Sequence, residues 1–414
     1  MRPMPPTPAT TAATPAPSAG ASAAEPRSDA LGLTLAPVSR AAFLEDSWEQ
    51  RPLYVPRREP GRFDGILSID DAESLVCESG IRVPAFRLAK DGAQISLGGY
   101  TEDISWRPGR FSGIARPGRV AEEYAGGATI ILQALHLHWH PAAVYCRGLE
   151  AALGWPVQAN AYLTPATAQG FAVHHDTHDV FVLQVSGRKR WRLYDPVMEL
   201  PLGAHRWSPG AHGAGPPVDE LTLEAGDTLY IARGWPHEAV AAEVDSLHLT
   251  IGLHPPTALD AFRDALDACA AEDVDFRRSL DPGGALPGRL LDRLAERLVP
   301  EEVTRRARRK FVVGRRPVLD GQLSSLRAVE RLGVHDLVRR RPTVIADLEL
   351  SEGSALLRFE GREVVFPRQA RAAVSAAYSA EAPFSAGDLP GPLDEAGRLV
   401  IVRRLIREGF LRPV

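Results

Sequence analysis

Seven short apolar segments, separated by turn residues, fill the chain between residues 127 and 254. They are rich in β-branched and aromatic residues, and each is too short to form an ordinary helix. Glycine, proline or aspartate stands at most of the breaks between them. This pattern is typical of an antiparallel β-barrel or jelly roll. The segments are ATIILQAL (128–135), VQANAYLT (157–164), FAVHHD (171–176), VFVLQV (180–185), RKRWRLYD (188–195), DTLYIA (227–232) and HLTIGLH (248–254).

The chain of 414 residues is long enough for two or three domains. Residues 1–30 are mostly Pro, Ala, Ser and Thr, which predicts a disordered tail rather than a secretory signal. We expect a mainly β domain over residues 31–256. Residues 257–317 have helical periodicity and a breaker, DPGG, and residues 318–414 combine helices with short strands, which suggests a winged-helix-like domain.

Composition excludes several classes of protein. No apolar run is long enough for a membrane span, and the net charge of −4 gives no reason to expect nucleic-acid binding. The basic run from Arg305 to Lys310 is interpreted as a solvated helix face. The three cysteines, Cys77, Cys146 and Cys269, are far apart in the sequence, which argues against a disulfide framework. We expect a soluble protein of the cytoplasm.

The segment from Gly170 onward contains an H-x-D pair. On a strand, His174 and Asp176 would point to one face and could both bind one cation. A third ligand follows downstream at His237, after a Gly-Trp-Pro corner. Two histidines and one carboxylate leave positions open on a metal, which is the arrangement that non-haem iron(II) oxygenases use for a 2-oxoacid and dioxygen.

Other histidines offer alternatives to this triad. His136, His138 and His140 would alternate along a strand and could bind zinc, but no fourth ligand follows at a useful spacing. His175 and His178 are interpreted as surface groups or as supports for the ligands.

Lys189 is one of only three lysines among 48 basic residues. Strand alternation places Lys189, Trp191 and Leu193 on one face, so the ammonium would point inward among apolar side chains. A buried ammonium needs a partner, and the distal carboxylate of 2-oxoglutarate would supply one. The alternative is a lysine that extends outward to water beside its arginine neighbours.

Five motifs in order carry a resemblance to a known family. With these motifs the chain resembles the JmjC ribosomal oxygenases, a cupin-like family that hydroxylates histidine or arginine in ribosomal proteins. The resemblance implies a JmjC double-stranded β-helix, a helical region that forms homodimers and a C-terminal winged helix. The motifs are N-A-Y-L-T-P from Asn160, G-F-A-x-H-x-D from Gly170, D-V-F-V-L-Q from Asp179, G-R-K-R-W from Gly187 and R-G-x-x-H from Arg233.

The same resemblance implies iron(II) as the metal and 2-oxoglutarate and dioxygen as cosubstrates. It assigns His174, Asp176 and His237 as catalytic metal ligands and Lys189 as the residue that binds 2-oxoglutarate. The implied reaction is hydroxylation of a side chain on a protein, with a ribosomal protein as the first candidate.

Further residues follow from the resemblance. Asn160 and Tyr162 match positions that contact the substrate side chain, and His248 and Thr250 are expected to border the cofactor. Histidyl hydroxylases of the family read T-I-S at the last strand, and the serine helps to hold the substrate. This chain has Gly252 instead, so the resemblance does not identify histidine as the target.

Three other functions stay open on the sequence. The chain could be a tailoring hydroxylase of a biosynthetic peptide, because one architecture serves several substrates. It could also be an N-methyl-lysine demethylase, although no aromatic cage is evident. The third alternative is a metal-binding cupin regulator without catalysis, which would not need a residue such as Lys189.

Overall fold

The computed structural model describes residues 29–208, 213–280 and 282–414. Most of the tail predicted over residues 1–30 therefore lies outside the described residues. At its end the prediction is wrong, because Asp29 caps helix α1 (Ala30–Leu35) and Ala30 is the first residue of that helix. The Asp29 carboxylate accepts a hydrogen bond from the Gly32 N–H at 2.6 Å, which stabilises the first turn.

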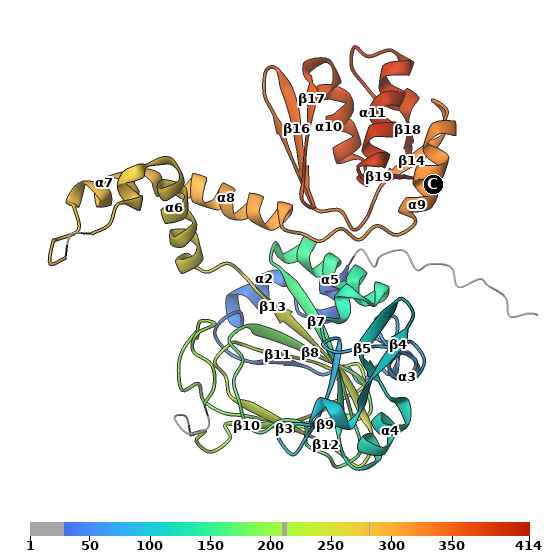
Figure 1. Ribbon diagram of the computed structural model, residues 1–414, viewed down its shortest axis with the longest axis vertical. Helices are drawn as coiled ribbons and strands as arrows, with labels where there is room; N and C mark the ends of the chain where they lie inside the picture. The colour runs from blue at the N-terminus through green and yellow to red at the C-terminus, as the bar shows by residue number, and fades with distance from the viewer. Residues whose placement is uncertain (1–28, 209–212, 281) are drawn as a thin grey trace, which may run out of the picture.

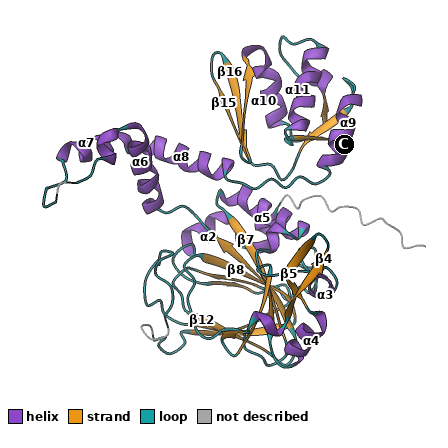
Figure 2. Ribbon diagram, in the orientation of Figure 1, coloured by secondary structure: helices purple, strands orange, loops and turns teal. Residues whose placement is uncertain are grey.

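Two antiparallel sheets pack face to face in the middle of the chain (Figure 2). A core of side chains from both sheets fills the space between them, including Val182 and Trp191. This arrangement agrees with the antiparallel jelly roll that the short apolar segments predict. In spatial order, the eight-stranded sheet consists of β1 (Leu53–Val55), β11 (Thr228–Ile231), β8 (Asp179–Ser186), β13 (Ser246–Leu253), β7 (Val157–Thr164), β6 (Thr129–Leu132), β2 (Phe86–Lys90) and β3 (Ala93–Gln94). The three-stranded sheet consists of β10 (Asp219–Glu224), β9 (Arg188–Leu193) and β12 (His237–Ala241).

The large sheet is buried on both faces. Strand β8 shows this, because Val182 faces the smaller sheet while Phe181 and Leu183 join a second core outside it. Side chains of the helices contribute to that outer core, among them Phe43 and Tyr145. The elements around the large sheet are α2 (Arg40–Asp46), α3 (Ile69–Cys77), the hairpin of β4 (Thr101–Trp106) and β5 (Gly109–Ala115), α4 (Pro117–Ala125) and α5 (His140–Leu153).

Two predicted strands do not form. Residues 171–176 make only one isolated bridge, between His174 and His237, and a second bridge joins Gln169 to Val240. The six residues 169–174 thus lie opposite the four residues 237–240, so a regular ladder is impossible. The segment from His136 to His140 is a 3-10 turn followed by the start of α5. Pro141 occupies the first turn of that helix, a position that favours helix over strand.

Three helices lead away from the sheets (Figure 1). They are α6 (Ala258–Glu272), α7 (Gly288–Arg297) and α8 (Pro300–Val313), and they match the helical segments predicted from the sequence. Thr257 and Asp260 form a capping box at the start of α6, which explains where that helix begins. None of the described helices is both long and apolar enough to cross a membrane.

The last part of the chain has a hydrophobic core of its own. Phe359, Val374, Leu405 and Phe410 belong to this core and come from different elements. Its elements are α9 (Gln322–Ala328), β14 (Leu337–Arg340), β15 (Ala346–Leu350), β16 (Ser354–Phe359), β17 (Arg362–Pro367), α10 (Arg371–Ser379), β18 (Phe384–Ser385), α11 (Glu395–Arg407) and β19 (Leu411–Pro413). They form two three-stranded sheets with helices beside them.

A buried ion cluster joins this C-terminal part to α5. Arg147 lies 3.2 Å from a carboxylate oxygen of Glu150 in the same helix and 3.2 Å from one of Glu360 in the β16–β17 turn. Arg315, after α8, pairs with Glu150 as well. Burial raises the pKa of Glu360 to about 7 although Arg147 lowers it, so the carboxylate has lost more hydration than its partners replace. The cluster also holds a sheet strand, because Glu150 accepts a hydrogen bond from the N–H of Val157, the first residue of β7.

We expect Arg147→Met to lower the free energy of unfolding by about 3 kcal/mol, because two buried carboxylates would lose the cation between them. Urea denaturation followed by circular dichroism measures this loss. Arg188→Met is the matched control, since its side chain and that of its partner Glu243 are both largely exposed. The control should change stability by less than about 0.5 kcal/mol. Equal losses in the two variants would show that the cluster does not hold the parts together.

Candidate metal centre

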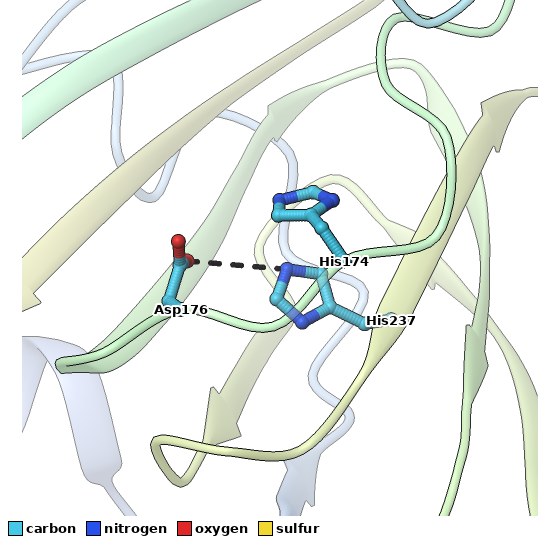
Figure 3. Close-up of side chains that lie close together, drawn as sticks. All are labelled: His174, Asp176 and His237. Carbon is cyan, nitrogen blue, oxygen red and sulfur yellow. Dashed lines mark ion pairs between the residues drawn. The ribbon is translucent and has the colours of Figure 1, made fainter. Parts of the chain in front are cut away.

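Three potential ligands converge at one edge of the small sheet. Ligand atoms of His174, Asp176 and His237 all lie within 4.8 Å of one another. Figure 3 shows the two imidazoles and the carboxylate turned toward a common point, with His237 Nε2 4.0 Å from Asp176 Oδ2. His174 and Asp176 come from the loop before β8, whereas His237 is the first residue of β12.

Backbone hydrogen bonds hold the two segments together. The N–H of His237 donates to the His174 carbonyl at 2.8 Å, and the N–H of His174 donates back at 3.1 Å. The N–H of Gly234 donates to the Asp176 carbonyl at 3.0 Å. Gly234 has φ +89°, and a Cβ there would lie 2.5 Å from the Met198 carbonyl oxygen. Only glycine fits this corner, so the Gly-Trp-Pro turn is what delivers His237 to the site.

The ring orientations suit metal binding. Nδ1 of His174 lies 2.8 Å from the Ala172 carbonyl oxygen, and Nδ1 of His237 lies 3.0 Å from that of Trp235. A carbonyl only accepts, so each Nδ1 carries a proton, and in the neutral form of the ring Nε2 then has the lone pair. Both rings are thereby fixed in the tautomer that a metal ligand needs.

The protonation states of His237 and Asp176 also favour metal binding. Burial, and then the neighbouring His174, lower the pKa of His237 to about 4, so its imidazole is neutral at neutral pH. Burial would raise the pKa of Asp176, but His178 and His237 beside it bring that pKa below its ordinary value, so the carboxylate is ionised. Neutral imidazole and ionised carboxylate are the forms that bind a cation.

The triad opens into a cavity of about 260 Å³ between the two sheets. Lys189 reaches this cavity from β9 and is only 3% exposed. Its Nζ donates to the Thr164 hydroxyl at 3.0 Å, and within the described ranges no carboxylate forms an ion pair with it. Burial lowers the pKa of Lys189 to about 7. The cavity therefore holds a buried amine that lacks a counterion, as the alternation along the strand predicts.

Aromatic and polar side chains complete the lining. His248 stacks on Tyr162 with ring centroids 4.8 Å apart, and Thr250 lines the cavity next to His248 on the same strand. Asn160 is paired in register with Thr250, and its Oδ1 accepts a hydrogen bond from the Ala134 N–H at 2.9 Å. Asn160 thus lies one row beyond Tyr162, in the direction of Gly252.

Among the lining residues that sequence reasoning missed, two are charged, Arg87 and Glu238. The Arg87 guanidinium lies 5.0 Å from the centroid of the Phe171 ring. Glu238 accepts hydrogen bonds from Gln169 and Tyr194. Arg87 comes from β2, far from every motif, so only the order of strands in the sheet could have revealed it. Glu238 directly follows the predicted ligand His237 in the sequence, and this adjacency was the one signal that could have indicated Glu238 as a lining residue.

The zinc alternative has no support in the structure. His136, His138 and His140 line a different cavity beside α5. Across residues 29–208, 213–280 and 282–414, the triad is the single group of three or more His, Cys, Asp or Glu residues whose ligand atoms converge. The H-L-H-W-H run does not contribute to it, because its histidines lie on a 3-10 turn and a helix start rather than on a strand.

Comparison with known sequences supports the assignment of this region. A JmjC-domain family model matches residues 136–261. Ribosomal oxygenase 1 of Gallus gallus is 31% identical over 258 residues, which are 59% of this chain and 41% of the relative. The bifunctional lysine-specific demethylase and histidyl-hydroxylase NO66 of Drosophila persimilis is 32% identical over 228 residues, 54% of this chain and 31% of that protein. The chain thus spans less than half the length of these relatives.

Solved structures show that the fold is shared as well. The Escherichia coli ribosomal oxygenase YcfD, solved in complex with cobalt and 2-oxoglutarate, aligns with a TM-score of 0.55 over 91% of this chain and 98% of its own length, at 19% identity. The two packed sheets with the triad between them are therefore a JmjC cupin fold. Residues 136–261 thus match the JmjC domain, and the chain is similar in sequence to the ribosomal oxygenases.

Proposed function

We propose that this protein is an iron(II)- and 2-oxoglutarate-dependent oxygenase that hydroxylates a protein or peptide side chain. One observation carries the proposal: a buried lysine, with no carboxylate partner among the residues that the structure describes, faces the cavity that also holds the His-Asp-His triad. A protein that only bound a metal would gain nothing from such an amine, because its burial is costly. A 2-oxoacid that binds the metal at one end needs a cation at the other.

The residues of the triad fit iron(II). Two imidazoles with free Nε2 lone pairs and one carboxylate supply three ligand atoms and leave coordination positions for a cosubstrate. His174, Asp176 and His237 would hold the ion, which when bound supplies the activation of dioxygen needed to hydroxylate a C–H bond. YcfD was solved with cobalt and 2-oxoglutarate, which supports the choice of cosubstrate.

The protein's own groups would bind and orient the cosubstrate. Lys189 would pair with the distal carboxylate, and the Thr164 hydroxyl would keep its Nζ in place. The stacked rings of Tyr162 and His248 and the Trp191 indole form an aromatic wall of the cavity beside the triad. A pre-shaped cavity would confine the reaction to a substrate side chain held at its open side.

A ribosomal protein is the first candidate substrate, because the relatives at about one third identity are named ribosomal oxygenases. NO66 is also named a lysine-specific demethylase. Mass spectrometry of ribosomal proteins separates the two reactions, since hydroxylation adds an oxygen atom and demethylation removes a methyl group. The tailoring of a biosynthetic peptide would leave the ribosomal proteins unchanged. We expect the enzyme to act in the cytoplasm.

We also propose that the chain is a homodimer joined through its helical region. Several large apolar side chains on these helices are exposed, among them Phe262 and Leu266 on α6 and Leu291 on α7. A second copy of the same surface would cover them. The C-terminal part, with its separate core, is proposed to be the winged-helix module suggested by the sequence.

The wild-type protein supplied with iron(II) and dioxygen should convert 2-oxoglutarate to succinate and carbon dioxide, and His174→Ala should abolish this conversion. His138→Ala is the control, because His138 lies beside α5 rather than at the triad. Succinate is measured by NMR. Succinate formation by His174→Ala at the wild-type rate would refute the proposed metal centre.

The affinity for 2-oxoglutarate should fall as the pH rises above about 7. Burial lowers the pKa of Lys189 to about 7, so the free protein carries the ammonium below that pH and loses it above. Binding of a carboxylate requires the ammonium, and the Kd should approach a tenfold increase per pH unit. Calorimetric titration of the cobalt-loaded protein measures this dependence. Lys189→Met should bind weakly at every pH, and a wild-type Kd independent of pH would contradict the role of Lys189.

The double variant Phe262→Asp and Leu266→Asp should be a monomer. Two charges on an apolar surface prevent its burial against a second copy. Light scattering after size-exclusion chromatography gives the mass of the wild type and the variant. Arg188→Met again serves as a control remote from α6. A wild type that is already monomeric would exclude the proposed dimer.

A further inference from the structure

Asp179, the first residue of β8, carries a buried carboxylate shortly after the ligand Asp176 in the chain. Its Oδ1 accepts a hydrogen bond from the Tyr230 hydroxyl at 2.6 Å and another from the Arg233 N–H at 3.3 Å. The Arg233 N–H belongs to the turn that leads to His237. One carboxylate oxygen therefore joins the two segments of the chain that carry the ligands. Because burial of a carboxylate is costly, this joint calls for an explanation.

The Arg233 side chain fixes the same turn by ion pairs. Its Nη2 lies 2.7 Å from Oε1 of Glu49, in the turn after α2, and its Nη1 lies 4.0 Å from Oδ2 of Asp179. The N–H of Glu49 donates to the Tyr230 hydroxyl at 2.9 Å, so the hydroxyl that donates to Asp179 is itself held in place. Glu49, Asp179, Tyr230 and Arg233 thus form one largely buried network, and they come from separate segments of the chain.

This network lies outside the metal cavity. The described residues that line the cavity include Asp176 and His237 but neither Asp179 nor Arg233. Arg233 instead lines a second cavity of about 600 Å³, which α6 and α8 border. The network can therefore influence a bound metal only through the ligands that it positions. The corner before His237 is bound twice to the Asp176 segment, because the Gly234 N–H donates to the Asp176 carbonyl at 3.0 Å and the Arg233 N–H to Asp179.

We propose that Asp179 is a positioning residue of the metal centre, an inference that rests on the proposed oxygenase function. Its carboxylate holds the turn before His237 at a set distance from Asp176, so that both ligands reach one ion without rearrangement. It binds neither the ion nor the cosubstrate. Without this carboxylate the ion itself would have to order the His237 turn, and the loss of preorganisation would lower the affinity for the metal.

Cobalt binding to the metal-free protein tests this role, with the variants Asp179→Ala, Asp179→Asn and Tyr230→Phe. Calorimetric titration gives the Kd for cobalt, and the visible absorption spectrum of the bound cobalt reports the geometry of its ligands. Arg341→Met is the matched control, because it removes a buried arginine of the C-terminal part from its ion pair with Asp320. The Tm of each metal-free protein measures the loss of stability separately from the loss of affinity.

Asp179→Ala should raise the Kd for cobalt about tenfold and change the visible spectrum, because the His237 turn loses its bond to β8. Asp179→Asn should bind cobalt with nearly the wild-type Kd, because the amide oxygen still accepts from the Arg233 N–H. Tyr230→Phe should raise the Kd about threefold, because the carboxylate loses one of the groups that fix its orientation. Arg341→Met should lower the Tm but leave the Kd and the spectrum unchanged, since the triad lies outside the C-terminal part.

An Asp179→Ala protein that is less stable but keeps the wild-type Kd and spectrum would overturn the inference, since the network would then be structural only. An equal increase in the Kd of Arg341→Met would also overturn it, because lower stability alone would explain the loss. If Asp179→Ala does not fold, Tyr230→Phe decides, and a wild-type Kd in that variant refutes the role of Asp179. A wild type that binds no cobalt would contradict the metal centre itself, and the inference with it.

Discussion

The bridge between His174 and His237 is the interaction on which the site depends. Two backbone hydrogen bonds, at 2.8 and 3.1 Å, join a loop to the start of β12 and so bring ligands from separate segments of the chain together. The same loop is fixed again where Gly234 donates to the Asp176 carbonyl. Because these bonds involve only the backbone, they leave all three ligand side chains free to point at one ion. Iron binding would then require little rearrangement of the protein.

Strand register determines which side chains surround the metal site. The pairing of β13 with β7 sets His248 opposite Tyr162 and Thr250 opposite Asn160. A slip of one residue would turn each of these side chains to the other face of the sheet. Lys189 is set by the small sheet, yet its Nζ bonds to Thr164 of the large one. The proposed anchor for the cosubstrate therefore exists only when the two sheets pack against each other.

The C-terminal part also supports the two sheets, through the ion cluster at α5. Glu360 reaches into the ion cluster of α5, and Glu150 in that cluster accepts a hydrogen bond from Val157 at the start of β7. The strand that carries Asn160 and Tyr162 is thus supported by residues outside the sheets. This arrangement links the position of the C-terminal part to the geometry of the cavity through buried charges, whose removal is costly.

The sequence by itself determined the strands of the sandwich, the helices from 258 to 313 and the inward direction of Lys189. These follow from local periodicity, which a chain carries in its own residue order. The strand predicted over residues 171–176 was wrong. The two-residue mismatch between this segment and β12 arises only when segments far apart in the chain meet. The sequence could not predict that Arg87 lines the cavity, because Arg87 comes from a strand far from every motif. Alternation says which face a side chain takes, but which residues share a space is decided by contacts between segments far apart in the chain.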